Sequence, residues 1–167
     1  AFGFTPFVGL FGAHDATERL IQATVVPGAS WDSNQRTQTL PALGVNVLMG
    51  TPTYLLRLGR LAMEEGHDLK SWNIKTLFVT GEVGPASSPA TGERLRSLWH
   101  CDVNEFSGAQ EQNYFAWSCS HGGYHWNEDM LSAEVHDPET KQPVPEGQSG
   151  ELVVTDLRQR THPLVRF

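Results

Sequence analysis

The sequence of 167 residues is 39% hydrophobic and 19% charged, which fits one folded domain and excludes a disordered chain. With 12 Lys and Arg against 19 Asp and Glu, the net charge of -7 argues against a nucleic-acid partner, because binding to a phosphate backbone needs a clustered cationic surface. No apolar run approaches the roughly 20 residues of a membrane span and the start carries no basic leader, so we expect a cytoplasmic protein without a membrane partner.

The first part of the chain alternates predicted helices and strands. Helices are expected over 12–23, 32–42 and 51–66, and strands over 24–29 and 45–50. Asp32 or Ser33 is the expected N-cap of the second helix, while Thr51 and Pro52 start the third. This alternation predicts an α/β fold with a largely parallel sheet and covering helices.

The second part begins in the same way and then changes. A strand is expected over 76–82, a helix over 88–100, and a strand from 103 that breaks at Gly108. Short alternating strands are then expected at LSAEVHD, GELVVTD and PLVRF, with a turn-rich stretch between the first two, which predicts a short antiparallel β section. We therefore divide the chain into an α/β portion over about 1–130 and a β-rich portion over about 131–167.

Three short segments follow predicted strands, at the edge where open parallel sheets bind ligands. They are Gly50-Thr51-Pro52, Thr80-Gly81-Glu82 and Ser107-Gly108-Ala109-Gln110-Glu111. Glycine lets a backbone approach a flat ligand closely, and a carboxylate can hold a metal–phosphate group. Taken alone, a glycine at a strand end is more often an ordinary turn, and a single Glu is more often a solvated surface charge.

The order of six segments carries more information than any one of them. GAHDATERLIQATVVP, VNVLMGTPTYLL, TLFVTGE, EFSGAQE, DPETKQPVPEGQSGELVVTDL and THPLVRF together resemble the phenylacetate-CoA ligase family of the adenylate-forming, AMP-binding acyl-CoA synthetase superfamily. The resemblance covers the whole chain and implies part of an AMP-binding domain. Both ends look cut, so we expect an internal fragment of the large N-terminal domain, inactive alone.

The resemblance also implies roles for individual residues. Glu111 is the implied catalytic residue, as the carboxylate that binds Mg²⁺. The implied nucleotide-binding residues are Gly81, Glu82, Val83, Ser107, Gly108 and Gln110. The implied wall of the acyl pocket is made of Phe11, His14, Tyr54 and Phe106. Aromatic walls favour an aromatic or arylacetic acid, although an aromatic residue in a buried strand is often plain core.

The chain departs from the family pattern at three of the implied site residues, two of them in the motif that ends at Glu111. Ser107 stands where the family has an aromatic residue, Gln110 replaces a Ser or Thr, and Val83 replaces a Pro. Glu105 is the second candidate for the metal-binding carboxylate. The family's phosphate-binding loop, ribose-binding Asp and catalytic lysine lie outside these residues.

A cluster of soft ligands follows the Glu111 segment. Cys119, His121 and His125 fall within seven residues, and thiolate and imidazole suit Zn²⁺. The alternative is a buried small thiol beside two exposed loop histidines. The two cysteines of the chain are too few for a secreted disulfide framework.

The implied function is an ATP-dependent, AMP-forming acid–CoA ligase. It activates a carboxylic acid with ATP to acyl-AMP and transfers the acyl group to coenzyme A, with Mg²⁺ as cofactor and Zn²⁺ left open. A homodimer is also left open. The first alternative is a non-catalytic binding module of the same fold. The departures from the family pattern at Ser107 and Gln110 leave this alternative open. A serine hydrolase is disfavoured because the chain lacks a G-x-S-x-G elbow.

Overall fold

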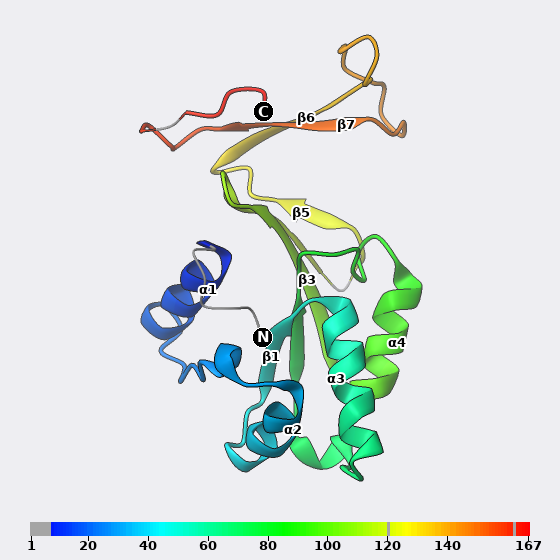
Figure 1. Cartoon of the computed structure of the whole chain (residues 1–167). Helices are drawn as coiled ribbons and strands as arrows, with labels where there is room; N and C mark the ends of the chain where they lie inside the picture. The colour runs from blue at the N-terminus through cyan, green and yellow to red at the C-terminus, as the bar shows by residue number, and fades with distance from the viewer. Residues whose placement is uncertain (1–7, 120, 162) are drawn as a thin grey trace.

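The computed structural model describes residues 8–119, 121–161 and 163–167. An α/β body carries a five-stranded sheet of order β1-β2-β3-β4-β5, and a two-stranded sheet, β6-β7, lies beyond one end of it (Figure 1). The strands are β1 Val47–Gly50, β2 Thr76–Val79, β3 Asp102–Ala109, β4 Asn113–Ser118, β5 Tyr124–Trp126, β6 Leu131–His136 and β7 Glu151–Asp156. The helices are α1 Val8–Arg19, α2 Ser33–Ala42, α3 Pro52–Glu64 and α4 Pro89–Trp99, with 3₁₀ turns η1 Gly28–Ser30 and η2 Leu69–Trp72.

Local signals place the two best-defined helix starts. Asp32 caps α2 and forms a reciprocal capping box with Gln35. Thr51 caps α3 by accepting a hydrogen bond from the N–H of Tyr54, and Pro52 occupies the first turn, where no N–H is needed. Both predicted helices are therefore confirmed.

The hydrophobic core lies between the parallel strands and the pair α3 and α4, which pack side by side on one face of the sheet (Figure 1). Trp99 at the end of α4 is almost fully buried, donates its indole N–H to the carbonyl of Leu55 at 3.1 Å, and meets Trp72 edge to face. Burying such large side chains supplies much of the stability of a domain this small.

The first three strands pair in parallel and in one register. Gly50 lies opposite Val79, and Val79 lies opposite Glu105, so the carboxyl ends of β1 and β2 meet at one edge of the sheet. The predicted α/β fold with a largely parallel sheet is thereby confirmed.

The antiparallel section begins earlier than the sequence indicated. We expected β3 to break at Gly108, which is wrong: the strand continues to Ala109 and pairs with β4, with an irregular register between Ser107 and Gly108. Strands β4 and β5 extend the sheet further and were not predicted. A strand can tolerate glycine when the ladder around it is made by a long-range partner.

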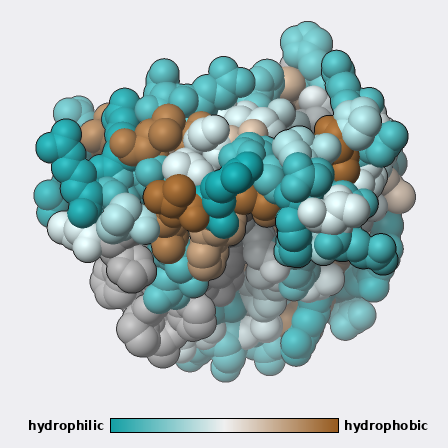
Figure 2. Space-filling model, turned by 90° about the horizontal axis from the view of Figure 1, so that it is seen from above, coloured by the Kyte–Doolittle hydropathy of each residue, from teal (hydrophilic) through white to brown (hydrophobic). Residues whose placement is uncertain are grey.

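The β6–β7 hairpin confirms two of the three predicted late strands. The last segment runs beside β7, where Val154 and Phe167 exchange backbone hydrogen bonds at 2.9 and 3.0 Å, although it forms no regular strand. Arg166 binds Glu134 across β7. The hairpin leaves Val135 and Leu152 exposed, and apolar patches are visible at this end of the molecule (Figure 2).

Two predicted boundaries near the start were wrong. Helix α1 begins at Val8 and ends at Arg19 rather than spanning 12–23, and it leaves Leu20 and Ile21 exposed. No strand forms over 24–29: residues 24–27 have no regular secondary structure, and η1 begins at Gly28. β-Branched residues favour an extended backbone, but a strand also needs a partner edge. Within the described ranges, no helix is both long and apolar enough to cross a bilayer.

Candidate active site

The ends of β1 and β2 bring two of the predicted segments into contact. The N–H of Thr80 donates to the carbonyl of Gly50 at 3.3 Å. Gly81 has φ +82°, a conformation that favours glycine, and a Cβ there would lie 3.7 Å from Thr51 Cγ2. The structure thus assembles the two segments at the sheet edge where ligands bind in open α/β folds.

The side chain of Glu82 points back to the start of α3. Its carboxylate accepts hydrogen bonds from the N–H of Thr53 at 3.0 Å and from the Thr53 hydroxyl at 2.7 Å. Partial burial raises the pKa of Glu82, but the hydrogen bonds from Thr53 outweigh it and leave this pKa below its usual range. The ionised carboxylate therefore ties the loop after β2 to a helix N-terminus, while neighbouring Val83 is 65% exposed.

The third predicted segment forms the end of β3 and the turn into β4. Ser107 is half-buried opposite Ala116, and Gly108 is exposed. Gln110 and Glu111 lie exposed in the turn. Glu111 is exposed, and none of the hydrogen bonds or ion pairs found between described residues involves its carboxylate.

The predicted aromatic wall is only partly assembled. Phe106 meets Tyr114 of β4 edge to face, with ring centroids 5.0 Å apart. Helix α1 approaches the same cluster, since a Cβ on Gly12 would lie 3.6 Å from the Tyr114 hydroxyl oxygen. His14 on α1 pairs with Glu18 at 3.3 Å. The side chain of Phe11 lies outside the described part of the structure.

Tyr114 is a residue that sequence reasoning missed. Burial raises its pKa, so its hydroxyl stays protonated well above neutral pH. The signal that would have found it is the hairpin register, which sets Tyr114 opposite Gly108 in the predicted nucleotide segment.

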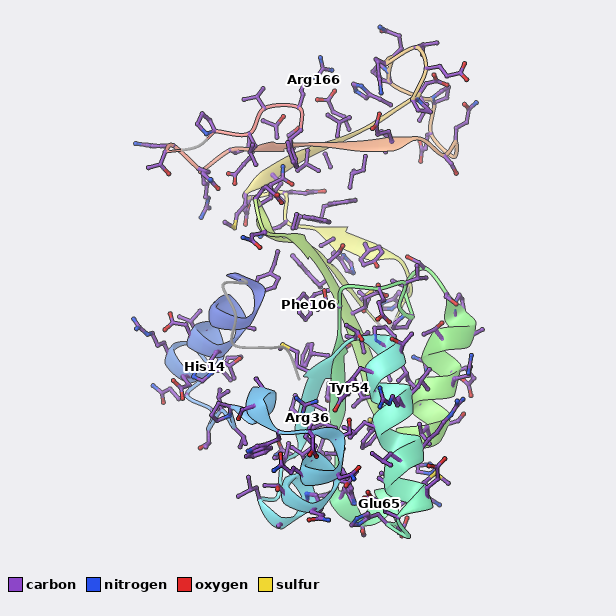
Figure 3. All side chains as sticks on the ribbon, in the orientation of Figure 1. His14, Arg36, Tyr54, Glu65, Phe106 and Arg166 are labelled. Atoms are coloured by element: carbon purple, nitrogen blue, oxygen red, sulfur yellow. The ribbon has the colours of Figure 1, made fainter. Side chains whose placement is uncertain are left out.

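Tyr54 is held in place by Arg36, a second residue that the sequence did not reveal. The Arg36 guanidinium donates to the Tyr54 hydroxyl and lies 5.1 Å from the centre of its ring. It also donates to the carbonyls of Gly28 and Ala29 in η1, at 3.1 and 3.2 Å. The labelled side chains of Arg36 and Tyr54 lie close together, with His14 apart on α1 (Figure 3).

Glu105 is not available to a metal ion, which removes it as the second candidate for the Mg²⁺ carboxylate. Its side chain is 3% exposed and accepts hydrogen bonds from Gly84, Ala86 and Tyr124.

The predicted zinc ligands are brought together in part. Cys119 Sγ lies 3.9 Å from His121 Nδ1 and accepts a hydrogen bond from the N–H of His121 at 3.4 Å. His125 on β5 instead stacks on Trp117, with ring centroids 6.2 Å apart. In the described part of the chain, no three His, Cys, Asp or Glu side chains form a group that could hold a metal. The zinc site stays a prediction.

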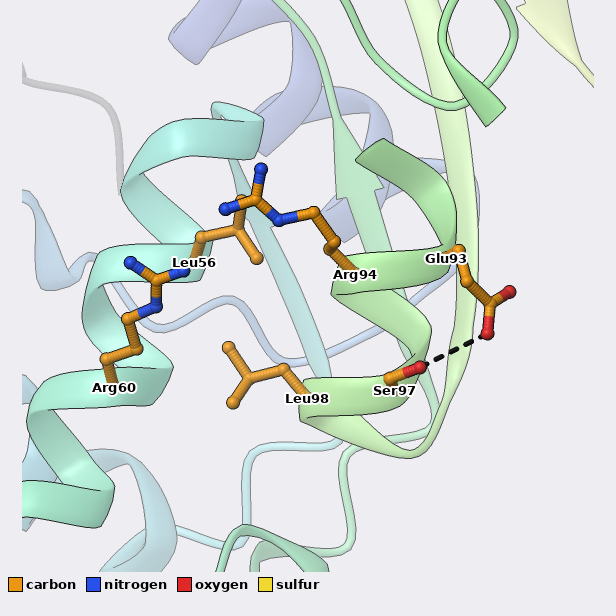
Figure 4. A pocket seen from close by; sticks show the side chains of 6 residues that line it. All are labelled: Leu56, Arg60, Glu93, Arg94, Ser97 and Leu98. Atoms are coloured by element: carbon orange, nitrogen blue, oxygen red, sulfur yellow. Dashed lines mark hydrogen bonds between the residues drawn. The ribbon is translucent and has the colours of Figure 1, made fainter. Parts of the chain in front are cut away.

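An open groove lies away from these residues, between α3 and α4. Its lining includes Leu56, Leu98, Arg60 and Arg94 (Figure 4). None of the predicted site residues lines it, so we place the candidate site at the sheet edge.

Comparison with known proteins shows what the chain is similar to. The chain is similar over its whole length to phenylacetate-coenzyme A ligases, with 31% identity over 179 residues to that of Pseudomonas putida and 27% over 171 residues to that of Escherichia coli (strain K12). It spans 38% of the length of each of these relatives. No family model matches the chain.

Solved structures carry the same fold. An open conformation of 2-hydroxyisobutyryl-CoA ligase in complex with 2-HIB-AMP and CoA matches all of this chain and 40% of its own, with a TM-score of 0.84 and 29% identity. ATP-bound MatB from Rhodopseudomonas palustris shares the fold over 89% of this chain and 29% of its own, with a TM-score of 0.68 and 22% identity. Sequence and fold agree along the entire chain, which is therefore a relative of the phenylacetate-coenzyme A ligases with the fold of adenylate-forming CoA ligases.

Proposed function

We propose that the whole protein to which this chain belongs is an ATP-dependent acid–CoA ligase. The acid's carboxylate oxygen attacks the α-phosphorus of ATP and pyrophosphate leaves; the thiol of coenzyme A then attacks the acyl carbon and AMP leaves. The observation that carries the proposal is the match of the whole chain to phenylacetate-coenzyme A ligases and to a ligase solved with acyl-AMP and CoA.

The nucleotide would lie across the sheet edge. We assign Gly81, Glu82 and Val83 to the adenine, with Ser107 at the position under it, and we assign Gly108 and Gln110 to the part of the nucleotide next to the acyl carboxylate. The positive φ of Gly81 supports a close approach of the backbone at this point.

Glu111 would hold Mg²⁺ beside the α-phosphate. Its exposed position in the β3–β4 turn supports this assignment, since a hard cation prefers carboxylate oxygens. A bound Mg²⁺ would neutralise charge that develops on the phosphate oxygens and orient the leaving group.

The acid would lie against the edge-to-face pair Phe106 and Tyr114, with Tyr54 and α1 nearby. This aromatic lining supports an aromatic or arylacetic acid. The test is pyrophosphate release by the whole protein with phenylacetate, benzoate, 2-hydroxyisobutyrate and a long aliphatic acid. Preference for either of the last two acids contradicts the aromatic assignment while leaving the ligase intact.

The second candidate is a non-catalytic binding module, which Ser107 and Gln110 favour because they change the motif nearest the nucleotide. Binding of ATP without pyrophosphate release, for any acid and at saturating Mg²⁺ and coenzyme A, identifies this case. We expect the isolated 167-residue chain to be inactive in either case, because it spans 38% of the length of the phenylacetate-coenzyme A ligases that it matches.

A zinc site at Cys119, His121 and His125 is kept as a separate proposal. Elemental analysis of protein purified without added metal should give one zinc per chain, and Cys119→Ser should remove it. Substoichiometric zinc that is unaffected by Cys119→Ser would reject the site.

A further inference from the structure

We propose that Glu105 is a positioning residue that locks the loop after β2 to β3 and thereby sets the affinity for ATP. This inference rests on the proposed function, because the locked loop carries Gly81, Glu82 and Val83. Glu105 itself is buried and touches no substrate.

The Glu105 carboxylate collects three donors from two other segments of the chain. Its Oε1 accepts from the N–H of Gly84 at 3.2 Å and from the Tyr124 hydroxyl at 2.5 Å. Its Oε2 accepts from the N–H of Ala86 at 2.7 Å. Within the described residues no Lys or Arg pairs with it, so these three donors stabilise the carboxylate. Hydrogen bonds to a carboxylate are stronger than bonds between neutral groups.

The loop after β2 packs closely against Glu105 at Gly84. A Cβ on Gly84 would lie 2.5 Å from Glu105 Cδ, far inside contact distance, so the backbone of the loop rests directly on the carboxyl group. Only glycine allows this approach.

The backbone of Glu105 is also held by partners on the neighbouring strands. Its Cα is in register with Val79, the last residue of β2, and its N–H donates to the Ser118 hydroxyl at 2.7 Å. Two residues further along β3, Ser107 begins the other segment assigned to the nucleotide. One buried side chain therefore sets the separation of the two segments that would grip ATP from either side.

The Tyr124 hydroxyl is the side-chain donor to the Glu105 carboxylate. Burial raises its pKa, and the hydrogen bond to Glu105 raises it further, so the phenol remains a donor throughout the neutral range. Tyr124→Phe removes one donor and leaves the two backbone N–H groups in place. Tyr124→Phe is therefore a milder change than Glu105→Gln. Glu105→Gln keeps the shape of the side chain but turns an amide N–H₂ toward at least one of the three donors.

The first measurement is amide hydrogen exchange on the whole protein, which needs no activity. In Glu105→Gln the amides of Gly84 and Ala86 should exchange at least 10-fold faster, as expected for loss of hydrogen bonds to a charged group. Tyr124→Phe should give a smaller increase. The control Glu93→Gln alters an exposed carboxylate on α4 and should leave both amides unchanged. Unchanged exchange in Glu105→Gln overturns the proposal.

The second measurement separates positioning from plain stability. Glu105→Gln should raise the KM for ATP about 10-fold or more while the KM for the acid stays within about two-fold. Faster loop exchange with an unchanged KM for ATP overturns the positioning role. If wild-type protein releases no pyrophosphate, the ligase proposal fails, and the exchange data together with the Kd for ATP still decide this one. If Glu105→Gln does not fold, Tyr124→Phe decides: it should speed exchange of the two amides and raise the KM for ATP by smaller factors, and no change in either quantity overturns the proposal.

Discussion

The contact between Arg36 and Tyr54 offers a direct energetic test of the structure. Arg36 is 9% exposed, and its guanidinium donates to the Tyr54 hydroxyl and to two backbone carbonyls of η1. Tyr54→Phe removes only the hydroxyl and keeps the ring over which the guanidinium lies. Losing a hydrogen bond that involves a charged group costs about 1.5–3 kcal/mol, so we expect Tyr54→Phe to lower the free energy of unfolding by about that amount.

Arg36→Met should cost more, because it also leaves the carbonyls of Gly28 and Ala29 without their donor. Part of that cost is offset, since the methionine removes a buried charge, and we expect a net loss of at least about 2 kcal/mol. The double variant should be less destabilised than the sum of the two, with a coupling energy of about 1–2 kcal/mol.

The assay is equilibrium urea unfolding of the whole protein for the wild type, both single variants and the double variant. Arg60→Met is the matched control, because Arg60 is exposed on α3 and should change stability by less than about 0.5 kcal/mol. Additivity of Arg36→Met and Tyr54→Phe within about 0.5 kcal/mol would refute the direct contact.

Three further predictions concern the site and the core. Glu111→Gln should lower the rate of acid-dependent pyrophosphate exchange by about 10²–10³ with little change in the KM for the acid, and an unchanged rate would mean that another carboxylate binds Mg²⁺. Gly59→Ala should destabilise the protein by about 1–3 kcal/mol, because a Cβ would lie 2.7 Å from Leu98 Cδ2; a midpoint of urea unfolding equal to that of the wild type would count against the packing of α3 on α4. Burial raises the pKa of Cys101 to about 11, so only about 10⁻³ of this thiol is thiolate at pH 8. In Cys119→Ser, where Cys101 is the remaining thiol of this chain, maleimide should react slowly at pH 8 and faster as the pH rises. Rapid labelling of Cys101 at pH 7 would contradict the burial of this thiol.

The sequence was most informative where short-range chemistry decides the structure. Asp32 and Thr51 cap their helices through side-chain bonds to residues three positions away, so the starts of α2 and α3 could be read locally. The apolar runs of β1, β2 and β3 are equally local. Their parallel order followed from the intervening helices, and this order places Gly50 and Gly81 at one edge of the sheet.

Other features depended on partners that are distant in the sequence. The TVVPGA segment has strand propensity but finds no edge to pair with, whereas β3 passes through Gly108 because β4 supplies its ladder. Burial of Glu105 could not be inferred from its neighbours, because its donors come from the loop after β2 and from β5.

What the sequence by itself determined is the alternation of helices α2, α3 and α4 with the parallel strands β1, β2 and β3, together with the family that the chain resembles. What only the tertiary structure decided is which side chains act in pairs: Glu82 with Thr53, Arg36 with Tyr54, and Glu105 with the loop after β2. The physical reason is that propensity and capping act over a few residues, whereas hydrogen bonds to buried groups depend on which distant segments the fold brings within about 3 Å of one another.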